Sequence, residues 1–197
     1  MLISSYLHAL CQALDLRAMQ DELDGAIKSI VHEEVQKHFG GFFQGDSSAK
    51  VEKLYKQASV AVLDSIEATS TMDNKARMEK AARATTTPVV EFFLTSDTNA
   101  DSESNTAALK VLPAFRDALA SRMAEKQHEL RVKYLTGAAG TTPASKLLGR
   151  TKSLYEFIRV DLGVRMHGRE NLDGFDGGIG KDERTVGGEI SVIYEVG

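Results

Sequence analysis

The amino-acid sequence predicts an all-α protein built from long antiparallel helices. The 197-residue chain has 42% hydrophobic and 26% charged residues, the balance of a globular protein that can bury a core. It contains 3 prolines and no tryptophan, and it is rich in alanine, leucine, glutamate, lysine and arginine, which suit helices better than sheets. Apolar residues also recur at the three- and four-residue spacing of amphipathic helices along most of the chain.

The residues before Gly40 are expected to form one helix, or two nearly continuous helices that meet at Gly25. Two apolar stripes support this, and they comprise Ile3, Tyr6, Leu7, Leu10 and Leu14, and then Ile27, Ile30, Val31, Val35 and Phe39. Gly40 and Gly41 supply a helix stop. No capping residue precedes the first stripe, so the opening residues are expected to continue a longer helix.

A second helix is expected to begin in the loop at 45–48 and to end by Ser70. Its inward positions are Val51, Leu54, Tyr55, Ala58, Val62 and Ile66. The apolar pattern continues over residues 72–94, with a break expected near Pro88, because proline removes a backbone donor and restricts the residue before it. The polar, acidic residues 95–105 predict a surface loop or a disordered connector.

A long helix is expected next, with Pro113 in its first turn and its end at Gly137. Its apolar positions are Leu109, Leu112, Leu119, Met123, Leu130 and Tyr134. Residues 142–162 then predict one amphipathic helix that Thr142 caps, with Pro143 at its first position and Gly163 at its end. Its expected inward face is Leu147, Leu148, Thr151, Leu154, Tyr155, Ile158 and Leu162.

The C-terminal part begins with a glycine-rich segment. Four glycines within residues 169–184 predict a loop, and they are Gly174, Gly177, Gly178 and Gly180. The residues after it fit either a short strand, from their β-branched content, or a helix that opens at Thr185 with Ile190, Ile193 and Tyr194 on one side.

Charge and cysteine content exclude several classes of protein. A net charge of −4 gives no basic footprint for nucleic acid. Cys11 is the single cysteine, so no intrachain disulfide framework exists, and its place on an apolar stripe predicts a buried small hydrophobe. No apolar run reaches the roughly 20 residues of a membrane span, and no signal peptide is recognisable. A cytoplasmic location is expected.

The histidines do not predict a metal site. His32 and Glu33 begin like a zinc-protease motif, but Gln36 stands where the second histidine belongs, and His38 points to another side of the helix. The other histidines are His8, His128 and His167, and they are expected to have no nearby partner histidine or cysteine.

Other motif-like strings are equally unspecific. The string GGIGKDE at 177–183 lacks the first glycine of a phosphate-binding loop, where Phe175 stands, and has Asp182 in place of the hydroxyl residue. Asp173, Asp176 and Asp182 miss the ligand order of a calcium loop. No serine, histidine and aspartate set can be nominated. We therefore assign no catalytic, cofactor-binding or metal-binding residue.

Three segments resemble a known family. They read SSYLHALCQALDLRAMQ at 4–20, TPASKLLGRTKSLYEFIRVDLGVRMHGRENLDG at 142–174 and TVGGEISVIYE at 185–195. Together they resemble the C-terminal part of the fungal-type phenylalanine ammonia-lyases, aromatic amino acid lyases with a methylideneimidazolone group. The likeness is strong at both ends of the chain and weak over residues 47–140. It favours the helix over the strand at 185–196.

The resemblance implies an activity and also a deficit. Family members are mostly helical homotetramers that convert L-phenylalanine, and sometimes L-tyrosine, to trans-cinnamate or p-coumarate and ammonia, in L-phenylalanine catabolism, cinnamate biosynthesis and phenylpropanoid metabolism. Their electrophile forms from an Ala-Ser-Gly triplet, which this sequence lacks. The family's catalytic tyrosines and Asn/Gln-rich substrate segment correspond to positions upstream of Met1. The resemblance thus implies a chain that is inactive alone and has no cofactor of its own.

The resemblance also implies a division of the chain. Residues 1–40 correspond to the end of the central helical bundle, 41–165 to an outer shielding domain, and 166–197 to a Gly-rich loop and the start of a terminal helix. The expected partners are further copies in a homo-oligomer, with the aromatic amino acid bound only by the complete enzyme.

Two other interpretations stay open. The first is a non-catalytic interaction module, whose stripe of Ile3, Leu7, Leu10 and Leu14 docks onto its own kind or onto a full-length homologue. The second is an unrelated helical bundle that shares these segments by chance.

Overall fold

The protein is all-α, as the sequence predicts. The computed structural model describes residues 2–43, 47–95, 102–168 and 185–196, and every regular element in these ranges is helical. The chain divides into two compact units, unit 1 of Met1–Leu23 with His128–Gly197 and unit 2 of Asp24–Gln127. No helix within the described ranges is long and apolar enough to cross a membrane. The three-part division at residues 40 and 165 stays a prediction.

The first helix is continuous. Helix α1 spans Leu2–Phe39 and is followed by a short 3-10 turn, η1, at Gly40–Phe42, where the glycine pair was expected to stop it. Gly25 causes no break, so the single-helix alternative is the right one. Leu23 and Ile27 are buried on either side of it, and their packing outweighs the small helix penalty of one glycine. The second apolar stripe of α1, from Ile27 to Phe39, is buried as predicted.

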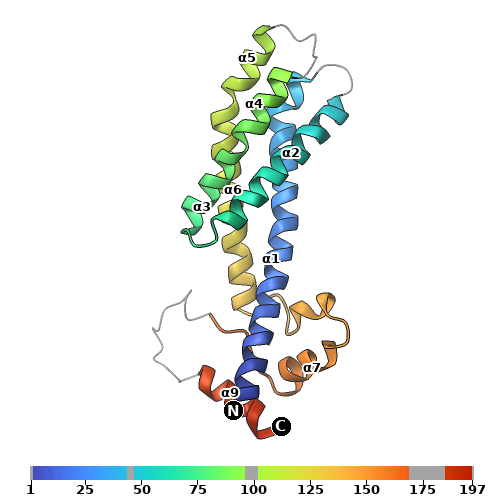
Figure 1. Ribbon diagram of the computed structural model, residues 1–197, viewed down its shortest axis with the longest axis vertical. Helices are drawn as coiled ribbons and strands as arrows, with labels where there is room; N and C mark the ends of the chain where they lie inside the picture. The colour runs from blue at the N-terminus through green and yellow to red at the C-terminus, as the bar shows by residue number, and fades with distance from the viewer. Residues whose placement is uncertain (1, 44–46, 96–101, 169–184, 197) are drawn as a thin grey trace. The chain divides into compact units, whose positions relative to one another are not determined.

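Unit 2 contains the helices α2 at Ser47–Ala68, α3 at Asn74–Ala84 and α4 at Thr86–Thr95 (Figure 1). Helix α2 packs against α3 and α4. The side chain of Arg77 fixes the end of α2, because its Nε and Nη2 both donate to the carbonyl of Ile66, at 3.0 and 2.8 Å. The break predicted near Pro88 is confirmed at Thr85, whose hydroxyl donates to the carbonyl of Ala82 at 2.6 Å.

Two further helices, α5 at Ser102–Lys110 and α6 at Leu112–Leu135, follow. The loop predicted for residues 95–105 is therefore wrong over its last part, because α5 already begins at Ser102; residues 96–101 lie outside the described ranges. Burial of Ala108 on this helix, which packs against α4, gives the polar segment a reason to be helical. Pro113 lies in the first turn of α6, as predicted.

The core of unit 2 is partly aromatic and encloses one carboxylate. The rings of Phe39 and Phe115 meet edge to face, with centroids 5.0 Å apart, and Phe43 stacks on Phe93 at 5.7 Å. Glu34 is buried, and Arg122 donates to its Oε1 at 2.7 Å. This ion pair joins α1 to α6 inside the unit.

The single helix predicted for residues 142–162 is wrong. The structure has a 3-10 turn, η2, at Pro143–Leu147, a short helix, α7, at Lys152–Glu156, and a π-helical turn, η3, at Phe157–Asp161. Leu148 is extended between the first two, with φ −104° and ψ 139°. Thr142 makes no side-chain capping bond, although Pro143 does take the first position of η2. Leu147 and Leu154 are half-exposed, whereas Tyr155 and Ile158 are buried as predicted.

Hydrogen bonds between the two pieces explain this break. The amide of Ala144 donates to the hydroxyl of Tyr155 at 3.3 Å, and the hydroxyl of Ser145 donates to Glu156 at 2.8 Å. On a straight helix, partners 11 residues apart would be separated by about 16 Å along the axis. The chain therefore folds back on itself between η2 and α7.

The last described element is helix α9 at Val186–Val196, which confirms the helix over the strand. The amide of Gly188 donates to the hydroxyl of Thr185 at 3.2 Å, so Thr185 caps this helix. Ile193 is buried, but Tyr194 is exposed, so only part of the face predicted for this helix turns inward. The predicted loop at 169–184 lies outside the described residues.

Candidate functional site

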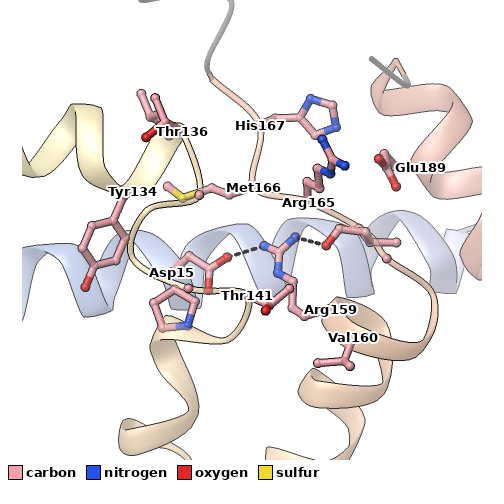
Figure 2. Close-up of a pocket in the computed structure, with 16 residues that line it drawn as sticks. Asp15, Tyr134, Thr136, Thr141, Arg159, Val160, Arg165, Met166, His167 and Glu189 are labelled. Atoms are coloured by element: carbon pink, nitrogen blue, oxygen red, sulfur yellow. Dashed lines mark hydrogen bonds and ion pairs between the residues drawn. The ribbon is translucent and has the colours of Figure 1, made fainter. Parts of the chain in front are cut away.

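A cavity of about 750 Å³ is the main candidate site in unit 1. Residues from α1, the end of α6, the loop that follows it, η3, residues 163–167 and α9 line the cavity (Figure 2). Its charged or ionisable side chains are Asp15, Tyr134, Arg159, Arg165, His167 and Glu189. A space of this size, with both signs of charge, is the usual starting point in a search for a binding site.

Asp15 and Arg159 form a buried ion pair in the wall of this cavity. Nη2 of Arg159 donates to Oδ2 of Asp15 at 2.5 Å, and Tyr155 donates its hydroxyl proton to Oδ1. Nη1 of Arg159 donates to the carbonyl of Val164 at 3.0 Å, as Figure 2 shows. Asp15 is 1% exposed and Arg159 2% exposed, so water cannot replace these partners.

Burial dominates the electrostatics of this network. It raises the pKa of Asp15, against the opposing effects of Tyr155 and Arg159. Burial and the hydrogen bond to Asp15 also raise the pKa of Tyr155 well above its ordinary value. Both oxygens of Asp15 are occupied, and the phenol holds its proton firmly. Asp15, Tyr155 and Arg159 are therefore arranged to hold η3 and α7 against α1, and they offer no free base or nucleophile.

Tyr134, near the end of α6, forms a second polar cluster. Its hydroxyl donates to Oε2 of Glu22 at 3.1 Å, and Lys133 contacts Oε1 of the same carboxylate at 2.6 Å. Burial, followed by the hydrogen bond to Glu22, raises the pKa of Tyr134 to about 12. This phenol is protonated at neutral pH and can act only as a hydrogen-bonding group.

Two histidines meet in unit 1, which the sequence reasoning did not foresee. The rings of His8 and His167 lie with centroids 5.3 Å apart and planes inclined by 54°. Burial, then His167 and Arg159, lower the pKa of His8. The expectation that neither histidine has a partner histidine was wrong, because 158 intervening residues hide the contact from a search for short spacings.

The other residues singled out in the sequence are separate in space. The ring of His32 lies edge to face with Tyr55 at 5.1 Å, and Nε2 of His38 lies 3.2 Å from a carboxylate oxygen of Glu34. His128 is exposed. No group of three or more histidine, cysteine, aspartate or glutamate side chains in the described part of the chain could hold a metal ion. The string at 177–183 and the aspartates at 173, 176 and 182 lie outside the described residues.

The prediction that Cys11 is buried is confirmed. The sequence reasoning did not identify Asp15 and Arg159 as residues of the site. Cys11 is 2% exposed, and burial raises the pKa of its thiol. Asp15 lies one turn beyond Cys11 on the buried side of α1, and Arg159 follows the buried Ile158. A charged residue at the spacing of a buried face is the signal that could have identified both.

The comparisons with known proteins agree with one another. No family model matches the chain. It is 44% identical over 195 residues to phenylalanine ammonia-lyase 1 of Pleurotus ostreatus, a match over 99% of this chain and 26% of the relative. It is 43% identical over 195 residues to phenylalanine ammonia-lyase str11 of Strobilurus tenacellus, with the same coverage of both chains. The chain thus spans about a quarter of the length of these curated relatives.

The fold agrees with the sequence match. A crystal structure of phenylalanine ammonia-lyase from the yeast Rhodosporidium toruloides superposes with a TM-score of 0.77 at 24% identity, over 99% of this chain and 27% of that one. A second structure of the same enzyme gives a TM-score of 0.76. At this identity the superposition shows a shared fold. Sequence and fold together show that the chain corresponds to the C-terminal part of the fungal-type phenylalanine ammonia-lyases.

Proposed function

We propose that this chain supplies scaffold and active-site shielding to a phenylalanine ammonia-lyase and does not deaminate an amino acid alone. The observation that carries the proposal is the 44% identity to a phenylalanine ammonia-lyase over nearly the whole chain but only 26% of the relative. The resemblance implies an electrophile formed from an Ala-Ser-Gly triplet, and the sequence has none. The complete enzyme would be a cytoplasmic homotetramer that acts on L-phenylalanine and has no nucleic acid or membrane partner.

The polar side chains around the cavity favour a scaffold role over a catalytic one. Deamination of an aromatic amino acid needs an electron sink, which a prosthetic group supplies and ordinary side chains do not. Asp15, Tyr155 and Arg159 are committed to one another, and Tyr134 to Glu22. These groups position helices and leave no activated nucleophile for a substrate.

The apolar surface of unit 1 supports a role within a larger assembly. In the first turns of α1, Ile3 is 76% exposed, Tyr6 69% and Leu10 52%, while the opposite side of the helix is buried. An apolar helical surface of this kind marks a contact with another polypeptide. The stripe predicted for docking was therefore only partly right. Ile3 and Leu10 are exposed, but Leu7 and Leu14 pack against the core of unit 1.

An activity assay tests the first half of the proposal. The purified chain, given L-phenylalanine or L-tyrosine, is expected to form no trans-cinnamate or p-coumarate above the rate of a protein-free control. Sustained turnover by the chain alone would overturn the proposal. Circular dichroism of the same sample must show a helical protein, so that inactivity does not reflect unfolding.

Complementation tests the second half. A Pleurotus ostreatus phenylalanine ammonia-lyase shortened by the residues that match this chain is expected to be inactive, and to regain activity when it is co-expressed with the chain. Ile3→Glu with Leu10→Glu should abolish the rescue, because two charges would enter the contact surface. The control variant, Ser121→Glu with His128→Glu, places the same charges at exposed positions of α6 and should rescue normally.

Analytical ultracentrifugation distinguishes the scaffold function from the alternative of a self-associating interaction module. A sharp dimer or tetramer of the isolated chain, together with failure of the rescue, would favour the self-associating interaction module. A polydisperse distribution, together with successful rescue, supports the scaffold function, because the apolar surface would then lack its specific partner.

A further inference from the structure

The 163–168 segment is held against α1 by a small set of contacts. The side chain of Gln12 makes two hydrogen bonds to the backbone of His167: its Nε2 donates to the carbonyl at 2.8 Å, and its Oε1 accepts from the amide at 3.0 Å. Val164 is buried in the core of unit 1, and its carbonyl accepts from Arg159. A further contact is the pair of imidazole rings of His8 and His167.

The Nε2 atom of His8 has no acceptor among the described residues for an added proton. His8 is 7% exposed, and its Nε2 has no hydrogen-bond partner among the residues that the structure describes. Nε2 of His167 is likewise without a partner in those ranges. A protonated imidazole donates from both nitrogens, so a buried imidazolium here would lack an acceptor.

The surrounding charges also disfavour an imidazolium. Arg159 of η3 acts on His8 electrostatically, and Arg165 lines the same cavity as His167. On α1 the neighbours are Cys11, which is neutral, and Asp15, whose two oxygens are already bound by Arg159 and Tyr155. The remaining ionisable groups at the cavity are Tyr134 of α6, which is neutral, and Glu189 of α9. Protonation of His8 would therefore add a second cation near Arg159.

We propose that the contact between His8 and His167 is a pH-sensitive device, in which protonation releases residues 163–168 from α1 while the helices stay folded. The proton is taken up by the imidazole of His8, and the two rings separate because the imidazolium of His8 is repelled by Arg159 and has no acceptor at its Nε2. The same segment forms part of the cavity wall. Its release therefore opens the cavity and uncovers the core residues beneath it.

The direction in which pH changes the stability of the closed state follows from the lowered pKa of His8. Burial lowers the pKa of His8 in the closed state. In the open state this pKa returns toward the ordinary value of about 6.5. The open state then binds more protons below that value, so the closed state loses stability as the pH falls through it. Above it both states are neutral, and the contact is unaffected.

Cys11 provides a specific readout of release. It is the only cysteine in the sequence, it is 2% exposed, and it belongs to the same buried cluster as Val164. The rate at which an aromatic disulfide reagent labels the full chain is measured about one pH unit above and one below the ordinary histidine pKa of about 6.5. The ratio of this rate to that of a His8→Gln variant cancels the intrinsic pH dependence of the thiol, because both proteins carry the same cysteine.

The ratio is expected to rise toward acid by up to about tenfold per pH unit for each proton taken up. His167→Gln should reduce the rise, because it removes one of the causes that lower the pKa of His8, and it keeps the test valid if the other variant fails to fold. His128→Gln, at an exposed position of α6, should behave like the wild type. Gln12→Ala should raise labelling at every pH, because it weakens the attachment without changing a titrating group.

Two results would overturn the inference. One is a ratio that does not change with pH in a protein whose labelling is measurable. The other is a rise in labelling that coincides with loss of the helical circular dichroism signal, because that would be global acid unfolding and not local release.

Discussion

The hydroxyl of Tyr155 donates to Oδ1 of Asp15, although the two residues are 140 positions apart in the chain. Arg159 occupies the other oxygen of the same carboxylate at 2.5 Å. One buried acidic side chain of α1 thereby fixes both α7 and η3. Loss of either partner of Asp15 should therefore destabilise this part of unit 1.

Replacing Arg159 with methionine should destabilise the protein strongly. Asp15 would stay buried without its counter-charge, which typically costs about 3–5 kcal/mol. Urea unfolding followed by circular dichroism measures the change. The loss should shrink as the pH is lowered, because burial already raises the pKa of Asp15 and a protonated carboxyl needs no counter-charge. Arg165→Met, at an exposed position nearby, should have little effect, and equal losses for the two variants would contradict the buried pair.

Replacing Tyr155 with phenylalanine should cost less. The change keeps the ring but removes the donor to Asp15 and the acceptor for the amide of Ala144. Leaving such buried groups unpaired costs about 1–3 kcal/mol. The same measurement on Tyr194→Phe, which is exposed, provides the control. Indistinguishable stabilities for the two variants would show that Tyr155 makes no significant buried hydrogen bond.

Alkaline titration should reveal Tyr134 as a late-ionising phenol. Burial and Glu22 raise its pKa to about 12 in the folded protein. Because the folded pKa lies above the ordinary value of about 10, the neutral phenol stabilises the fold below that pH. This contribution is lost as the pH rises from there toward about 12. Tyrosinate absorbance of the wild type and of Glu22→Gln should show an earlier transition in the variant; identical curves would exclude the effect of Glu22.

In unit 2, the two carboxylates that Arg122 contacts should differ in importance. Glu34 is buried, whereas Glu33 is exposed, and Arg122 donates to Glu33 at 2.6 Å. Glu33→Gln should leave the unfolding midpoint almost unchanged, because solvent screens an exposed ion pair. Arg122→Gln should lower the midpoint clearly, because Glu34 loses its partner on α6 and stays buried. A larger effect from Glu33→Gln would reverse this ranking.

Most of the helices were predictable, because each buries a regular apolar stripe. The face of α2 from Val51 to Ile66 and that of α6 from Leu112 to Tyr134 are inward with few exceptions. These stripes repeat with the period of the helix itself, so local sequence is sufficient to find them.

The prediction of one helix over residues 142–162 was wrong for a physical reason. Their pattern fits one helix, but Tyr155 and Ser145 make hydrogen bonds that require a fold-back. The hydroxyl of Tyr155 also donates to Asp15 of α1, and local sequence cannot report a contact over 140 positions. Tertiary contacts override helix propensity in this region.

The candidate site was less predictable than the fold. Its residues come from both ends of the sequence, and the pair of Asp15 and Arg159 spans 144 positions. The contact between His8 and His167 was missed for the same reason. The absence of the Ala-Ser-Gly triplet, in contrast, is read directly from the sequence, because a covalent triplet is local.

The three prolines of the chain share one structural setting. Pro88 lies in the first turn of α4, Pro113 in the first turn of α6 and Pro143 at the first position of η2. At these positions a missing amide proton breaks no helical hydrogen bond. What proline changes there is the disordered chain, whose φ angle it restricts, so fewer conformations are lost on folding. The three prolines therefore stabilise the folded protein by lowering the conformational entropy of the unfolded chain.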